Sequence, residues 1–87
     1  MPEISRFYGI IIKMFFNDHF PLHFHAEFGE FKAMISIETG EVLQGEMPLK
    51  QLKLIQAWVI LHEKELVENF EGLRKLPVAW HHIEPLK

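Results

Sequence analysis

The hydrophobic pattern of the chain changes its period once, at Pro48, and this change constrains the fold more than any other feature. Before Pro48, apolar and polar side chains alternate in short runs that are separated by turn residues, which is typical of β-strands. After Pro48, apolar side chains recur every three or four residues, which is typical of an amphipathic helix. The sequence therefore predicts a sheet that is followed by one helix.

Four segments before Pro48 are predicted as strands, namely residues 7–16, 23–28, 31–38 and 41–46. The first is almost wholly apolar, so we expect it to be buried on both faces. Gly29-Glu30 and Thr39-Gly40 have the composition of tight two-residue turns. The last three strands should therefore form an antiparallel meander.

The helix is predicted from Pro48, whose missing N–H costs nothing in a first turn, to Phe70. Its apolar stripe comprises Leu52, Leu54, Ile55, Trp58, Val59, Leu61, Leu66 and Phe70. Residues 78–87 are too apolar to stay in solvent, so we expect them to pack on the sheet or on another subunit. The whole pattern predicts one α+β domain over residues 1–87. It is a small two-layer sandwich of about four antiparallel strands, one long amphipathic helix and an extended C-terminal tail.

Composition excludes several classes of protein. The 87 residues include no cysteine, which excludes a disulfide scaffold, a cysteine zinc site and a thiol nucleophile. No apolar run is long enough to span a membrane, and the start at Met1 has no secretory signal, so we expect a cytoplasmic protein without a membrane partner. The net charge of −3 gives no support to a nucleic-acid partner. Eight Phe and two Trp exceed the needs of one small core, which favours a homo-oligomer.

The segment from Asp18 to Glu27 contains most of the candidate metal-binding and acid–base residues. On a strand, His23 and His25 leave the same face about 7 Å apart, and Asp18 can fold back beside them from the preceding turn. Two imidazoles and a carboxylate suit zinc or manganese, so Asp18, His23 and His25 are predicted metal ligands. His23 and His25 are also candidate catalytic residues, because a pair of imidazoles can serve as general acid and base. Alternating polar residues are equally typical of a half-exposed strand, in which both would have a structural or interfacial role.

Two further residues are candidate ligands for an anion. Arg6 precedes the first predicted strand, and His19 lies in the turn before His23. If they converge on the histidine pair, they would bind a phosphate or carboxylate group and resemble the phosphate site of a ribonuclease.

The motifs Met1-Pro2-Glu3-Ile4 and Asn17-Asp18-His19, followed by His23-Phe24-His25, resemble a family of short bacterial proteins with a domain of unknown function. Members begin Met-Pro-x-Ile-x-x-Phe-x-Gly-Ile and carry the motif N-D-H-x-P-P-H-F-H, in which this chain has Leu22 in place of a proline. The resemblance implies that Asp18, His19, His23 and His25, with Arg6, form a shared site. It also implies a small protein partner, in an arrangement similar to toxin–antitoxin pairs.

Three hypotheses about function follow. The first is a cytoplasmic interaction module, homo-oligomeric and one member of a toxin–antitoxin-like or regulatory pair. The second is a nuclease or other phosphodiester-cleaving enzyme that uses His23 and His25, with or without a metal ion. The third is an oligomer that binds a small anionic ligand over Arg6 and the histidine pair.

Overall fold

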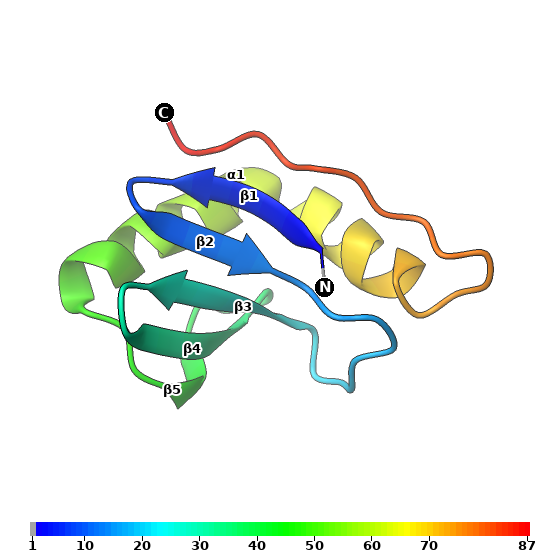
Figure 1. Cartoon of the computed structure of the whole chain (residues 1–87), viewed down its shortest axis with the longest axis horizontal. Coiled ribbons are helices and arrows are strands. Elements are labelled where there is room, and N and C mark those ends of the chain that lie inside the picture. Colours follow the sequence, from blue (N-terminus) through cyan, green and yellow to red (C-terminus); the bar gives the residue numbers. More distant parts are fainter. Residues whose placement is uncertain (1) are drawn as a thin grey trace.

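The computed structural model describes residues 2–87 and contains one sheet and one helix (Figure 1). The elements are β1 (Glu3–Phe7), β2 (Ile10–Lys13), β3 (His23–Phe28), β4 (Phe31–Ser36), β5 (Val42–Gly45) and α1 (Leu49–Gly72). The strands form one antiparallel meander in the order β1-β2-β3-β4-β5, and α1 covers one face of it. The predicted α+β architecture is confirmed.

The prediction of one strand over residues 7–16 is wrong, because the chain reverses within this segment. Tyr8 and Gly9 have φ values of 49° and 79°, so they form a two-residue turn of the kind that closes hairpins. Phe7 pairs with Ile10 across this turn, β1 begins at Glu3, and the sheet has five strands. The turn was hidden because Ile10 and Ile12 face the core while Ile11 lies on the opposite face, which makes the run continuously apolar.

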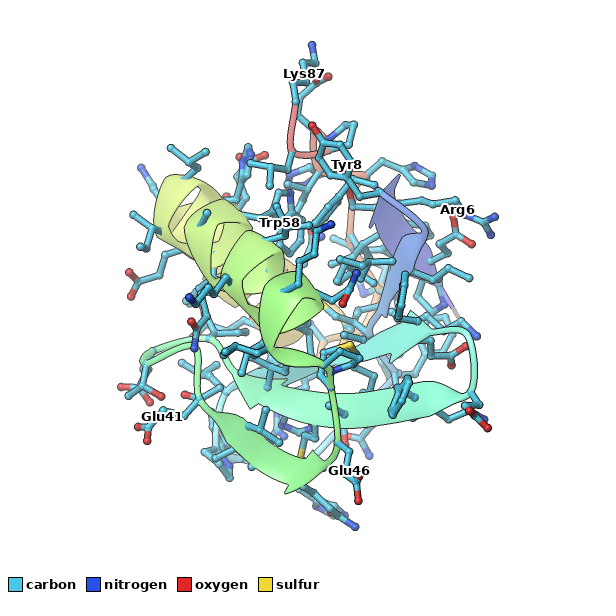
Figure 2. The ribbon with its side chains drawn as sticks, turned by 90° about the vertical axis from the view of Figure 1, so that its left-hand side faces the viewer. Arg6, Tyr8, Glu41, Glu46, Trp58 and Lys87 are labelled. Carbon is cyan, nitrogen blue, oxygen red and sulfur yellow. The ribbon has the colours of Figure 1, made fainter. Side chains whose placement is uncertain are left out.

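The core lies between the sheet and α1. Fully buried isoleucines of β1, β2 and β4 pack there with Phe24 against the buried face of the helix. Trp58 points from α1 toward β1 and β2 (Figure 2), and its ring centroid lies 5.3 Å from that of Phe7. Its buried indole N–H donates a hydrogen bond of 2.8 Å to the carbonyl oxygen of Glu84, so the C-terminal tail closes the core.

The helix departs from the prediction at one point. His62 has non-helical dihedral angles (φ −128°, ψ 20°), so α1 is kinked there. Leu61 was predicted on the apolar stripe but is 67% exposed, because at about 100° per residue it lies roughly 120° around the helix from the buried Ile55. The helix ends at Gly72, where a side chain would overlap the carbonyl oxygen of Ala79.

The tail packs on the sheet, as predicted. It runs back beside β1 (Figure 1), and the amide of Ile83 donates a hydrogen bond of 2.9 Å to the carbonyl oxygen of Ile4. The buried Asn69 of α1 binds the backbone of His81 through both its amide group and its oxygen, at 2.7 and 3.0 Å. Within residues 2–87, no helix has the length and apolarity needed to cross a membrane.

The face of the sheet opposite α1 has no helix over it. The pairing register places His25 and Glu27 of β3 on this face, opposite Met34 and Lys32 of β4. Lys13 of β2 pairs with His25 on the same face. We call this the open face, and the candidate site lies at its edge.

Candidate metal centre

The loop between β2 and β3 brings Asp18 beside the start of β3. The loop is fastened to the end of α1, because the amide of Asn17 donates a hydrogen bond of 3.1 Å to the carbonyl oxygen of Leu73. Arg74 donates a further hydrogen bond to the backbone oxygen of Asp18, and its guanidinium stacks on the Phe20 ring at 4.5 Å. The position of Asp18 is therefore set by residues more than 50 positions away in the sequence.

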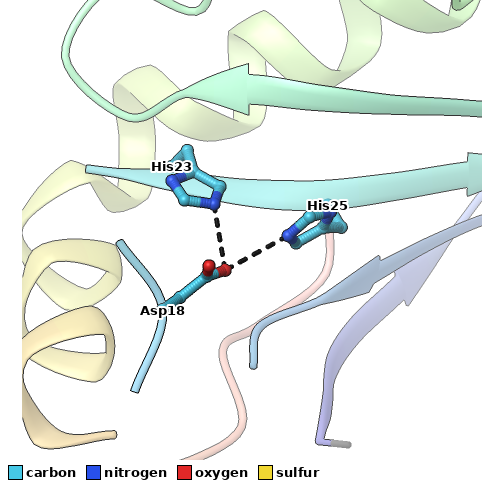
Figure 3. A group of neighbouring side chains, drawn as sticks. All are labelled: Asp18, His23 and His25. Carbon is cyan, nitrogen blue, oxygen red and sulfur yellow. Dashed lines mark hydrogen bonds and ion pairs between the residues drawn. The ribbon is translucent and has the colours of Figure 1, made fainter. Parts of the chain in front are cut away.

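Asp18, His23 and His25 converge on one point (Figure 3). Oδ2 of Asp18 lies 2.9 Å from Nε2 of His23 and 3.2 Å from Nε2 of His25. Oδ1 of Asp18 accepts a hydrogen bond of 3.0 Å from the amide of His19, which fixes the orientation of the carboxylate. The three side chains thus present one oxygen and two nitrogens within 4.8 Å of one another.

The buried ring of His23 has one nitrogen without a proper partner. Its Nδ1 lies 2.6 Å from the carbonyl oxygen of Pro21, which can only accept, so Nδ1 carries the proton. In the neutral ring, Nε2 then directs a lone pair toward the Asp18 carboxylate. Although these atoms are only 2.9 Å apart, Nε2 forms no hydrogen bond of acceptable geometry and is fully buried. A cation between the two atoms would remove the repulsion.

The pKa shifts of Asp18 and His25 favour the charge states in which these two groups bind metal. Burial lowers the pKa of His25 and outweighs the opposing hydrogen bond to Asp18, so the neutral ring is favoured near pH 7. Burial raises the pKa of Asp18, but hydrogen bonds from the His25 ring and the His19 amide, together with the charge on His23, outweigh it and leave the pKa lowered. A carboxylate and neutral imidazoles are the species that coordinate divalent metals.

The hydrogen bond that orients the His23 ring is also typical of a metal centre. A histidine that binds a metal through one nitrogen commonly donates the other N–H to a carbonyl, as His23 does to Pro21. Ligand atoms about 2.0–2.1 Å from zinc at tetrahedral angles lie about 3.3 Å apart, close to the two spacings around Oδ2 of Asp18. The side chains of Asp18 and His25 stay 22% and 27% exposed, so one side of the cluster faces solvent.

The structure does not bring the two predicted anion ligands into this cluster. Arg6 lies on β1, where its guanidinium binds the Glu3 carboxylate at 2.8 Å, and it points away from the helix (Figure 2). His19 gives its backbone amide to Asp18, while its ring is exposed. Strand pairing places Arg6 opposite Ile11, two strands away from His25, which the sequence did not reveal because the hairpin at Tyr8 was missed.

Sequence reasoning missed the residues that support the cluster. The Phe15 ring meets His25 edge-on with centroids 4.2 Å apart, and Phe70 of α1 lies 5.6 Å from His23 in the same manner. The sequence assigned no role to Arg74. Its position directly after α1, close to Phe70 in helical spacing, was the one sequence signal available.

Comparison with known proteins gives one match. The family described as a domain of unknown function (DUF4160) matches residues 9–71, which include Asp18, His23 and His25. No curated protein and no solved structure matches the chain.

Proposed function

Since the chain belongs to the DUF4160 family, a domain of unknown function, we propose its function from the site: the protein binds one divalent metal ion through Asp18, His23 and His25. The observation that carries this proposal is the buried Nε2 of His23, which lies 2.9 Å from the Asp18 carboxylate and forms no hydrogen bond. Zinc and manganese suit two imidazoles and one carboxylate.

The shape of the site favours a reactive centre over a structural one. Structural zinc sites use four protein ligands, whereas catalytic sites use three and leave a position for water or substrate. Only three groups converge here within residues 2–87. A bound ion of this kind supplies Lewis acidity and a water of lowered pKa. Pro21 and His19 orient the ligands, while the exposed side of His25 gives an anionic substrate access. This arrangement supports the hypothesis of a metal-dependent, phosphodiester-cleaving enzyme.

Isothermal titration with Zn²⁺ and Mn²⁺ tests the metal proposal. We expect one ion per chain, and we expect His23→Gln and His25→Gln each to weaken binding by at least about 100-fold, since loss of an outer-shell partner alone costs 10–100-fold. His82→Gln is the matched control, because its ring lies in the exposed tail beside Trp80. Equal binding by wild type and both site variants, or no binding by wild type, would show that the cluster is not a metal site.

A separate observation supports an interaction module as a second candidate function. Ile60 and Leu61 are 78% and 67% exposed, and with Val67 they line a hollow of about 570 Å³ on the outer side of α1. An apolar patch of this kind is typical of a protein–protein contact. We infer that the chain self-associates through this patch. The toxin–antitoxin-like partner remains a prediction from the resemblance alone.

Sedimentation velocity distinguishes an oligomer from a monomer and so tests self-association. We expect an oligomer at micromolar concentration that Leu61→Glu converts to a monomer. Leu76→Glu, at a residue 94% exposed but outside the patch, should leave the oligomer intact. A wild-type monomer would refute the module in its homo-oligomeric form, and loss of the oligomer in both variants would place the contact elsewhere.

A further inference from the structure

A hollow of about 520 Å³ lies on the open face of the sheet, directly beside the metal centre. The side chains that line it include those of Phe15, His25, Glu27, Lys32, Met34 and Gln44. The strand register places His25, Met34 and Gln44 in one row across β3, β4 and β5. One residue therefore belongs both to the metal centre and to the hollow, namely His25. The volume falls within the range of small-molecule sites.

The charges around the hollow favour an anionic ligand. Glu27 stands opposite Lys32 in the register, yet its carboxylate lies 3.1 Å from Nζ of Lys13 on the other side. Among residues 2–87, Lys32 has no ion pair, and its side chain is exposed. Lys32 lies diagonally from His25 across the β3–β4 pair, a separation that long side chains can bridge. A ligand anion at the metal would therefore lie within reach of an uncompensated ammonium group.

The apolar side chains of the hollow favour an aromatic group attached to that anion. The ring of Phe15 is perpendicular to that of His25, with centroids 4.2 Å apart, and Phe15 lines the hollow. Met34 is half-buried in the floor, and its thioether adapts to aromatic rings. Gln44 adds an amide that can donate or accept a hydrogen bond at the far end.

We propose that this hollow is the substrate site of the metal centre, and that it takes a small aromatic phosphate-like anion whose charged group lies between the metal ion and Lys32. Binding of the charged group rests on the proposed metal function, whereas binding of the aromatic group depends only on Phe15 and Met34. Experiment can therefore refute either kind of binding without refuting the other.

Titration calorimetry with phenylphosphonate and methylphosphonate tests the inference, because neither probe can be hydrolysed. Both are titrated into the zinc-loaded and the metal-free protein. We expect phenylphosphonate to bind at least 10-fold more tightly than methylphosphonate. Met34→Ser should remove that preference while leaving methylphosphonate binding unchanged. Lys32→Ala should weaken both probes by about 5-fold, and Lys53→Ala, an exposed lysine of α1, should change neither.

The outcomes separate the two proposals. Failure to bind Zn²⁺ or Mn²⁺ refutes the metal function. The proposal that the hollow binds an aromatic anion then holds only if the metal-free protein still prefers phenylphosphonate and Met34→Ser removes that preference. Equal affinities of the two probes in both forms, or a preference that survives Met34→Ser, overturns the inference. Because Met34 and Lys32 lie on the open face outside the core, circular dichroism should show both variants folded as wild type.

Discussion

His23 and His25 of β3 occupy different environments, although the alternation of the sequence places both on the same face of the strand. His23 is 3% exposed and donates Nδ1–H to a backbone carbonyl, whereas His25 is 27% exposed and borders the hollow on the open face. The alternation of β3 decided that both leave the same face. The loop anchored by Arg74 decided which of them is covered. Burial therefore covers His23, whereas part of His25 faces the hollow.

At the residue scale, Trp58 offers the sharpest test of the core. Trp58→Ala removes a fully buried ring and its hydrogen bond to Glu84, so we expect a loss of about 3–5 kcal/mol in the free energy of unfolding. Urea denaturation followed by circular dichroism measures it. Trp80→Ala, at a half-buried position in the tail, should cost clearly less. A loss below about 1 kcal/mol for Trp58→Ala would contradict the packing described here.

At the element scale, the packing of the C-terminal tail on α1, here called the joint, depends on polar contacts of the helix after its kink. Nδ1 of His62 lies 2.8 Å from one carboxylate oxygen of Glu65, and the ring of His81 lies 3.4 Å from the other. Asn69 adds two hydrogen bonds to the same stretch of tail. These contacts explain why an apolar tail without regular structure lies in a defined place beside β1.

The Glu65 carboxylate should make this joint sensitive to acid. The hydrogen bond from His62 lowers the pKa of Glu65 below its ordinary value of 4.5, against a smaller opposing effect of burial. A lowered carboxyl pKa stabilises the fold above the unfolded-state value, and that contribution is lost as the pH falls through the folded value. Glu65→Gln should therefore be less stable than wild type at pH 6 by less than about 1 kcal/mol, as is usual for exposed pairs.

Urea unfolding at pH 6 and pH 3 checks this expectation. The difference between wild type and Glu65→Gln should shrink between pH 6 and pH 3, because the folded wild type loses the contribution of the ionised carboxylate as the pH falls through its lowered pKa. Glu63→Gln, at an exposed neighbour in α1 that forms no ion pair within residues 2–87, is the control and should show no difference at either pH. A constant difference at both pH values would refute the role of Glu65.

At the scale of the whole molecule, the metal centre joins parts that are distant in sequence. The loop after β2, the start of β3 and the residues after α1 all meet at Asp18. The three proposed ligands lie within residues 18–25, but Leu73 and Arg74 hold their loop in place only in the folded chain, so metal binding should stabilise the fold as a whole. The match to the family model covers residues 9–71, which include Asp18, His23 and His25 but end before Leu73 and Arg74.

Metal should therefore raise the melting temperature. An ion at about 100 times its dissociation constant adds about 2.7 kcal/mol of stability, which corresponds to roughly 10–20 °C for a domain of this size. Scanning calorimetry with Zn²⁺ and after chelation measures the shift. His23→Gln, with binding at least about 100-fold weaker, should shift by no more than about 3 °C at the same zinc concentration. An equal shift in the variant would locate the bound ion outside the Asp18 cluster.

The sequence by itself determined the class of the fold and identified Asp18, His23 and His25 as candidate metal ligands. Alternation before Pro48 and helical spacing after it require a sheet and a helix, because each pattern buries one apolar face only in its own geometry. The positions of His23 and His25 on one face of a strand follow from the same alternation. The strand over residues 23–28 was predicted with the bounds that the structure gives to β3.

Only the tertiary structure decided the rest. The hairpin at Tyr8 and Gly9 depends on positive φ angles that an apolar run conceals, and it placed Arg6 two strands from the site. The convergence of Asp18 with the histidines depends on hydrogen bonds to Leu73 and from Arg74, which no local pattern encodes. The open hollow beside His25 likewise exists because α1 covers one face of the sheet and leaves the other free. Local periodicity fixes elements and faces, whereas contacts between distant segments fix burial and the meeting of side chains.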